Sequence, residues 1–275
     1  MSATTTREAE TTRSRPPAPV RPRTFSRRQK IVITVVNLAL FCVAWELVAR
    51  LSGVPSLLVP TFSAVVGEFF AMRQEGILWA NLWISLQIYL VGMALSILAA
   101  IPFGLLVGGI KILDRIVGPY VWALYTLPRL ILMPLILLWV GINDTARVLL
   151  VVLSAGPAII VVIMDAMKTI EPSLVRAARS FCAGRRQVFT HVALPSTVPY
   201  IATAVRMGVS RGLIGLFIGE LFTAADGIGY VMVLAGRQFN SARVYFILLV
   251  FVAFSVALVG LTQWLEKKAS IWRSA

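Results

Sequence analysis

Long apolar runs constrain this chain more than any other feature. Six runs approach the length of about 20 apolar residues that a helix needs to cross roughly 30 Å of hydrocarbon with its backbone hydrogen bonds satisfied internally. Of the 275 residues, 58% are hydrophobic and 14% are charged, whereas about a quarter are charged in soluble domains. We therefore predict an all-α fold, a polytopic transmembrane helical bundle with six spans. The predicted spans are residues 31–49, 83–109, 117–140, 147–164, 199–222 and 244–264.

The third run differs from the others because it contains three prolines. Pro119, Pro128 and Pro134 each lack a backbone donor, so each favours a kink or a break. Broken helices at membrane depth face protein or a cavity. We expect this span to be the least regular of the six.

The basic residues predict the orientation of the chain. Eighteen of the 26 Lys and Arg residues fall on one side of the predicted spans, and the positive-inside rule places that side in the cytoplasm. Both termini are then cytoplasmic. Residues 1–30 have almost no apolar content and are predicted to be a disordered basic cytoplasmic arm, in preference to a cleavable signal peptide. Residues 31–275 are predicted to form the transmembrane domain.

Several kinds of chemistry lack support in the sequence. Gly is nowhere followed by Lys, so the chain has no G-x-x-x-x-G-K-[ST] phosphate loop, and any ATP must be hydrolysed elsewhere. The only histidine, His191, has no acidic or cysteine cluster near it, which favours a structural or solvated role over a metal site. The net charge of +14 flanks apolar runs and does not indicate nucleic-acid binding. We predict no catalytic residues, no metal site and no cofactor in this chain.

A polar segment between the fourth and fifth spans carries the most specific pattern. Residues 171–199 read EPSLVRAARSFCAGRRQVFTHVALPSTVP, with apolar residues at helical spacing on both sides of Gly184. Pro172 suits a first helical turn, Gly184 suits a turn, and Pro195 suits a stop. We predict two short amphipathic helices on the cytoplasmic face, able to lie on lipid or to dock onto a protein.

This segment resembles the cytoplasmic loop of the permease subunits of bacterial ABC importers, which reads E-A-A, three residues, G, and then I-x-L-P. Arg176, Ala177 and Ala178 match E-A-A, Cys182 matches G, and 192–195, ending in Leu194 and Pro195, match I-x-L-P. Arg176 therefore replaces the family's Glu, and Cys182 replaces its Gly. Three further stretches, VPSLLVPTFSAVVGEF, VGPYVWALYTLPRLILMPLILLWVGI and IGELFTAADGIGYVM, are similar to the nitrate, sulfonate and taurine branch.

The resemblance implies a type I ABC importer permease in the bacterial cytoplasmic membrane. Its partners would be ATP-binding cassette ATPase subunits that hold ATP and Mg, an extracytoplasmic solute-binding protein and a second permease copy, most simply as a homodimer. The segment 165–195 would couple ATP hydrolysis to transport through Arg176, Ala177, Ala178, Cys182, Gly184, Leu194 and Pro195. The solute would be an anion such as an alkanesulfonate, taurine or nitrate.

Four glycines form a stripe along the fifth span. Gly208, Gly212, Gly215 and Gly219 fall within roughly 60° of one another on a helix. Such stripes let membrane helices approach closely. The stripe predicts either helix packing within the chain or an interface between copies or along the transport pathway.

Charged residues inside spans are costly and point to function. Arg211 lies about 18 Å from Pro199 along the fifth span, and Arg129 lies within the proline-rich third span. We hypothesise that Arg129, Arg211 and Glu220 line a translocation path that favours an anion. The alternative is that each arginine pairs with a backbone carbonyl or with Glu220 for structural reasons.

Three other functions stay open. Similar-looking permeases carry a thiamine-precursor pyrimidine or a flavin. A secondary transporter or channel would need inverted repeats or a buried proton or sodium site, and the sequence shows neither. A membrane scaffold without transport activity gains support from the altered Arg176 and Cys182.

Overall fold

The structure is a computed structural model that describes residues 26–223 and 226–270, and within this part of the chain every regular element is a helix. Twelve helical elements follow one another along the chain. They are α1 (Arg27–Leu51), α2 (Phe62–Gln74), α3 (Ile77–Gly109), α4 (Lys111–Thr126), α5 (Arg129–Val140), α6 (Asp144–Lys168), α7 (Pro172–Ser180), α8 (Arg185–Val188), the π-helix η1 (Phe189–Ala193), α9 (Leu194–Thr223), α10 (Ile228–Arg237) and α11 (Ser241–Ser270).

The chain divides into two compact units, Met1–Trp45 and Glu46–Ala275. The first unit contains most of α1, in which the rings of Phe41 and Trp45 meet edge-on with their centroids 6.0 Å apart. Residues 1–25 of the predicted basic arm lie outside the described residues, and α1 begins at Arg27, within the last part of that arm. The second unit contains the remaining helices and every site discussed below.

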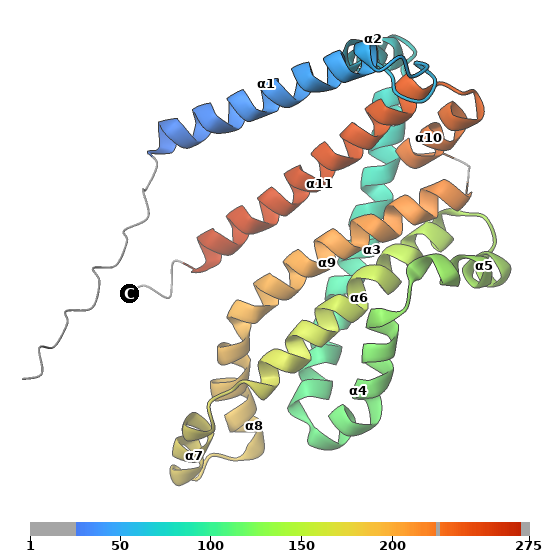
Figure 1. The fold of residues 1–275 in the computed structure, drawn as a ribbon. Coiled ribbons are helices and arrows are strands. Elements are labelled where there is room, and N and C mark those ends of the chain that lie inside the picture. Colours follow the sequence, from blue (N-terminus) through green and yellow to red (C-terminus); the bar gives the residue numbers. More distant parts are fainter. Residues whose placement is uncertain (1–25, 224–225, 271–275) are drawn as a thin grey trace, which may run out of the picture. The chain divides into compact units, whose positions relative to one another are not determined.

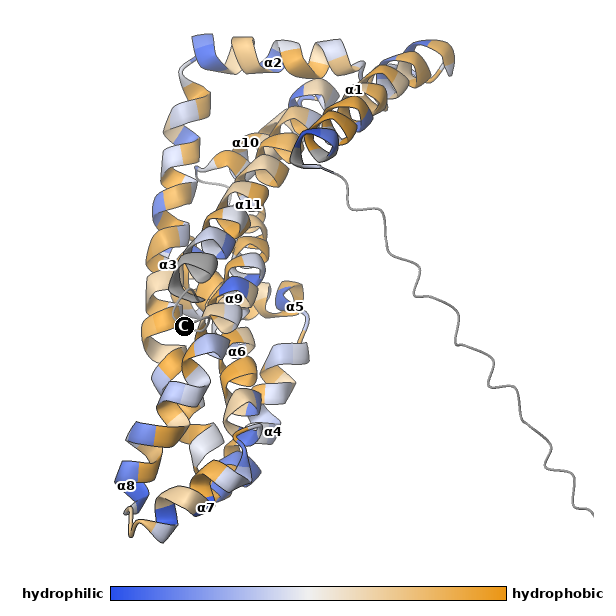
Figure 2. Cartoon of the chain, turned by 90° about the vertical axis from the view of Figure 1, so that its left-hand side faces the viewer, coloured by the Kyte–Doolittle hydropathy of each residue, from blue (hydrophilic) through white to orange (hydrophobic). Residues whose placement is uncertain are grey.

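The structure confirms the transmembrane helical bundle. Five helical stretches of the described residues are long and apolar enough to cross a membrane, and α4 with α5 makes a sixth span if the bent pair is counted as one. Figure 2 shows the apolar residues running along α3, α6, α9 and α11, while polar residues gather on α7 and α8.

The third predicted span is broken, as its prolines suggest, but at only one of them. The axes of α4 and α5 differ by 99°, and the break lies at Leu127 and Pro128. Leu127 has a ψ of 128°, the extended conformation that a following proline imposes. Pro119 and Pro134 lie inside α4 and α5, because neighbouring groups in a bundle can compensate for a missing donor.

Helix α6 is the centre of the second unit. It packs against both α3 and α9, and Figure 1 shows α6 and α9 running side by side while α3 crosses behind them. Its residues Leu150, Ile159, Ile163 and Met164 are fully buried. Asn143 caps the start of α6, since its side-chain oxygen accepts from the backbone N–H of Ala146 at 3.0 Å. This three-helix core supports the candidate sites, which lie at the ends of α6, at the start of α9 and beside the middle of α9.

Candidate coupling segment and arginine site

The segment 165–195, called the coupling segment below, contains the end of α6, α7, a tight turn, α8, η1 and the first two residues of α9. Pro172 is the first residue of α7, where its missing N–H costs nothing. After the turn, the backbone N–H of Gly184 donates to Gln187 Oε1 at 2.8 Å and caps α8. Between them Cys182 has a φ of 58°, in the left-handed region that favours glycine. The backbone here therefore has the conformation that a Gly, as in the family pattern, adopts without strain.

The expectation that Pro195 ends a short helix is wrong. Pro195 is the second residue of α9, and helix runs without interruption from Arg185 to Thr223. The π-helical turn η1 lies directly before α9. In a regular α-helix the pyrrolidine ring of Pro195 would clash with the carbonyl group four residues earlier. The wider π-helical turn makes room for the proline, so the helix continues. The second half of the coupling segment is thus the rigid start of a membrane-spanning helix.

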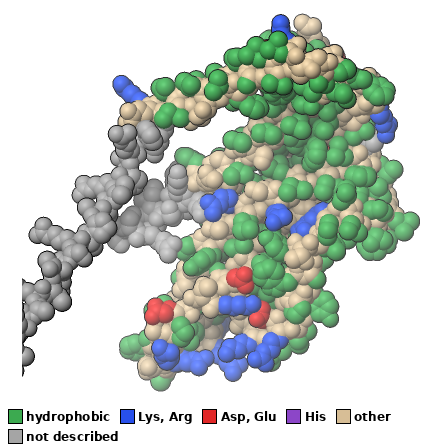
Figure 3. Space-filling model, viewed as in Figure 1, with side chains coloured by type: hydrophobic (Ala, Val, Ile, Leu, Met, Phe, Trp, Pro, Cys, Tyr) green, Lys and Arg blue, Asp and Glu red, His purple; other side chains and the backbone are tan. Residues whose placement is uncertain are grey.

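The coupling segment presents exposed apolar and basic side chains. Phe181 is 88% exposed and Leu174 is 48% exposed, although both are large apolar residues. Figure 3 shows Lys and Arg side chains gathered at the end of the second unit where α7 and α8 lie, and Arg176, Arg179, Arg185 and Arg186 are exposed there. Among the described residues, none of these four arginines forms an ion pair.

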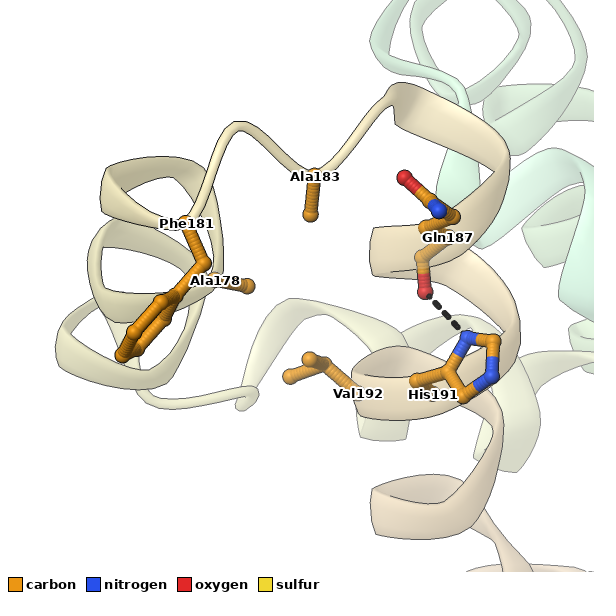
Figure 4. Close-up of a pocket in the computed structure, with 6 residues that line it drawn as sticks. All are labelled: Ala178, Phe181, Ala183, Gln187, His191 and Val192. Atoms are coloured by element: carbon orange, nitrogen blue, oxygen red, sulfur yellow. Dashed lines mark hydrogen bonds between the residues drawn. The ribbon is translucent and has the colours of Figure 1, made fainter.

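A shallow notch separates α7 from the helix that follows. It has a volume of about 250 Å³ and is lined by Ala178, Phe181, Ala183, Gln187, His191 and Val192. In Figure 4 the Phe181 ring points away from Gln187 and His191, and the ring nitrogen Nδ1 of His191 lies 3.1 Å from the carbonyl oxygen of Gln187. Within the described residues, no group of three or more His, Cys, Asp or Glu side chains could hold a metal ion.

The glycine stripe of the fifth span lies against α6. A Cβ at Gly208 would sit 2.7 Å from Ile159, and a Cβ at Gly215 would sit 2.5 Å from the carbonyl oxygen of Leu150. At Gly212 the nearest atom is the Met93 sulfur of α3, at 2.9 Å. All four glycines are buried, so the stripe brings α9 close to α6 and α3 of the same chain.

The structure brings Arg129 and Arg211 together around Tyr125. Arg129 begins α5, and its Nη1 donates to the carbonyl oxygens of Tyr125 at 2.8 Å and Leu127 at 2.6 Å. Arg211 reaches across from α9, with its Nη2 3.5 Å from the Tyr125 hydroxyl and its guanidinium carbon 5.4 Å from the ring centroid. We call Tyr125, Arg129 and Arg211 the arginine site. The structure thus brings together two residues that the sequence assigned to one path. Arg129 also makes the backbone-carbonyl contacts that the structural alternative expected.

Glu220 is not part of the arginine site. It lies nine residues beyond Arg211 on α9, about 13 Å along the helix, and it is fully buried. Ser85 Oγ donates to Glu220 Oε1 at 2.5 Å, and the backbone N–H of Gly229 donates to Oε2 at 2.8 Å. A Cβ at Gly227 would lie 2.5 Å from Oε1, so the carboxylate fills the space beside the turn into α10. Glu220 therefore anchors this turn to α3.

Sequence reasoning missed Arg147, the largest fully buried side chain among the described residues. It lies at the edge of the fourth predicted span, where an arginine can usually reach water. Arg147 pairs with Asp144 one turn earlier, and its Nη1 lies 2.5 Å from Asp226 Oδ1. The i,i+3 spacing of Asp144 and Arg147 was a local signal of an ion pair, but nothing local pointed to Asp226.

Comparison with known proteins identifies the family. The family model of the binding-protein-dependent transport system inner membrane component matches residues 100–271. The chain is 29% identical over 214 residues to the taurine transport system permease protein TauC of Escherichia coli, covering 76% of this chain and 78% of TauC. It is 27% identical over 240 residues to the riboflavin transport system permease protein RibX of Chloroflexus aurantiacus, covering 87% and 90% of the two chains.

A solved structure shares the fold. A chain of the MetNI methionine ABC transporter, in an inward-facing conformation, superposes with a TM-score of 0.59 and 22% sequence identity, over 70% of this chain and 94% of that one. The family match, the relatives and the apolar helices agree with the resemblance that the coupling segment suggested. This chain belongs to the family of binding-protein-dependent transport system inner membrane components, and it is the multi-pass permease subunit of an ATP-driven ABC importer.

Proposed function

We propose that the chain carries a small anion into the cytoplasm as one of two identical permeases, with both termini cytoplasmic. An extracytoplasmic solute-binding protein delivers the solute, and ATPase subunits bind ATP and Mg and dock on the coupling segment. The permease supplies the path and no catalytic residues. Because one chain has a single coupling segment, two copies related by a two-fold axis match a pair of ATPase subunits.

The observation that carries this proposal is the way the coupling segment is joined to the core. Within the chain α7 packs on α8 and η1, and it leaves Phe181 and Leu174 uncovered. One end of the segment follows α6 directly, and the other end is continuous with α9. Since α6 and α9 pack closely through the glycine stripe, a force applied at α7 reaches both central helices.

The solute class rests on the relatives and on charge. TauC is named for taurine, a sulfonate, and RibX for riboflavin, which is neutral, and their similarity to this chain is nearly equal. The two arginines of the arginine site favour an anion such as an alkanesulfonate, taurine or nitrate. A flavin or a thiamine-precursor pyrimidine is the second candidate solute, supported by RibX.

The proposal is tested with the full-length chain in nanodiscs and its cognate ATPase subunit. Replacing the exposed Phe181 with Ala removes an aromatic anchor of the kind that dominates protein interfaces, and we expect ATPase binding to weaken at least about tenfold. Phe239→Ala is the matched control, because Phe239 is 73% exposed and also has a positive φ, of 57°, but lies between α10 and α11.

Equal ATPase binding by the two variants would contradict docking through α7. A wild-type chain that transports solute without any ATPase subunit would show an ATP-independent transporter. A wild-type chain that binds the ATPase but moves no tested solute into proteoliposomes, with binding protein and ATP supplied, would favour the scaffold.

A further inference from the structure

We propose that the arginine site is an oxyanion-binding site within the permease, so that the membrane subunit itself recognises the negatively charged group of the solute. This inference rests on the proposed function only in taking the bound anion to be the solute. It assigns recognition to Tyr125, Arg129 and Arg211, at the break between α4 and α5. The ligand class is a sulfonate, carboxylate, nitrate or similar group with two or more oxygens.

Arg129 is held in place and still has unused donor capacity. The carbonyl oxygens that it binds, of Tyr125 and Leu127, belong to the C-terminal end of α4 and to the break, where no further helical turn satisfies them. Both bonds come from Nη1, and Nη2 is a buried atom without a hydrogen-bond partner among the described residues. A buried donor without a partner costs about 1–3 kcal/mol unless a ligand or water accepts from it.

Arg211 supplies the second charge from a different helix. It lies halfway along the fifth span, about 18 Å from both Pro199 and Thr223, and its side chain is exposed on the surface of the chain. An arginine at this depth that faced lipid would be expensive, so it faces protein or a water-filled path. Tyr125 contacts both arginines, since its backbone carbonyl oxygen accepts from Arg129 and its hydroxyl oxygen accepts from Arg211.

The charges of this site are not balanced within the described chain. No carboxylate there lies within 4.0 Å of Arg129 or Arg211, although Arg50, Arg147 and Arg243 all have such partners. Two like charges that converge on one tyrosine repel each other, and this repulsion is relieved when an anion lies between them. The arginines of the coupling segment also lack ion pairs among the described residues but are exposed, whereas Arg129 is partly buried, and we infer that its missing counter-charge comes from outside the chain.

The geometry of the donors fits an oxyanion better than a halide or a neutral solute. Guanidinium groups present two parallel N–H donors that match the oxygens of a carboxylate or sulfonate. Two such groups and a phenol can together donate to three oxygens. A neutral flavin ring gains nothing from either charge.

The test measures binding of radiolabelled taurine to the full-length permease in nanodiscs, without ATPase or binding protein. Charge-assisted hydrogen bonds are worth about 1.5–3 kcal/mol, so we expect Arg211→Gln to weaken binding roughly 10- to 100-fold. Arg211→Lys keeps the positive charge but loses the paired N–H donors of the guanidinium group. We therefore expect a loss of taurine affinity smaller than that of Arg211→Gln. Arg237→Gln removes the same charge from the exposed end of α10 and should leave affinity unchanged.

Competition with unlabelled solutes identifies the chemical group that the arginine site recognises. Unlabelled ethanesulfonate and nitrate should displace taurine, and riboflavin should not. Arg129→Gln should also weaken binding, with gel filtration showing whether the chain stays folded, since Arg129 also caps α4. Affinity within twofold of wild type in Arg211→Gln, or displacement by riboflavin alone, would overturn the inference.

The design separates this inference from the proposed function. If the chain couples to its ATPase but does not bind taurine, or binds it equally well without Arg211, the importer function is supported and the anion site is refuted. A chain that binds taurine through Arg211 but never couples to an ATPase keeps the site and loses the importer mechanism.

Discussion

Gly215→Ala is the substitution for which the structure makes the sharpest prediction. The new methyl group would lie 2.5 Å from the carbonyl oxygen of Leu150 and 2.5 Å from Ser154 Oγ, whereas ordinary contacts begin at 3.4 Å. Ser154 can turn aside, but the Leu150 carbonyl is backbone of the central helix α6. Helix α9 must therefore retreat from α6 by about 0.9 Å, which forfeits about a quarter to a half of the dispersion energy of each contact along the seam.

The expected cost of Gly215→Ala is about 1–3 kcal/mol of unfolding free energy, the usual range for overpacking. For a chain of this length that lowers the midpoint of thermal unfolding by about 2–12 °C. The assay heats the detergent-solubilised full-length chain and measures the folded fraction by gel filtration. Gly260→Ala in α11 is the matched control, because nothing lies within 4 Å of its added Cβ, and its midpoint should be unchanged or slightly raised. Equal midpoints for the two variants would refute close α6–α9 packing.

Two further predictions concern the coupling segment and the ion pairs that the buried Arg147 makes with the exposed Asp144 and the partly exposed Asp226. Cys182→Gly should stabilise the turn after α7 by about 0.5–1 kcal/mol, because glycine adopts a φ of 58° without strain, and should slow hydrogen exchange of the turn amides about 2- to 5-fold. Cys182→Ala keeps a Cβ, so exchange as slow as in the glycine variant would contradict this account. Asp144→Ala and Asp226→Ala should each lower stability modestly, while the double variant leaves Arg147 buried without a carboxylate and should lose about 3–5 kcal/mol. Strictly additive unfolding midpoints would show that the two carboxylates do not share one cation.

Hydropathy predicted the spans well because bilayer thickness fixes their length, and no long-range information is needed to find a run of apolar residues. Hydropathy could not show which of the three prolines breaks the third span. Only Pro128 breaks the span, since Pro119 and Pro134 lie where the packing of α4 and α5 tolerates a missing donor. The prediction that Pro195 ends a helix was wrong for a related reason, because the π-helical turn before Pro195 allows the helix to continue.

The sequence also could not show which of the candidate site residues lie together in the fold. The cost of burying charge marked Arg129, Arg211 and Glu220 as exceptional, but it could not say which of them meet. Glu220 belongs with Ser85 and the turn into α10, a pairing that depends on how α3 crosses α9. Arg147 escaped notice because it sits at the edge of an apolar run, where an arginine usually reaches water.

The break in the third span and the arginine site have one physical origin. Pro128 forces Leu127 into an extended conformation and ends α4, which leaves the last carbonyl groups of α4 without helical partners inside the bundle. Arg129 satisfies two groups there, of Tyr125 and Leu127, but in doing so it fixes a positive charge beside Arg211. A neutral donor such as Gln could cap a carbonyl without that charge. Arginine at this position, next to a second arginine that has no carboxylate partner among the described residues, therefore does more than cap the broken helix: it supplies the charge that the proposed anion site requires.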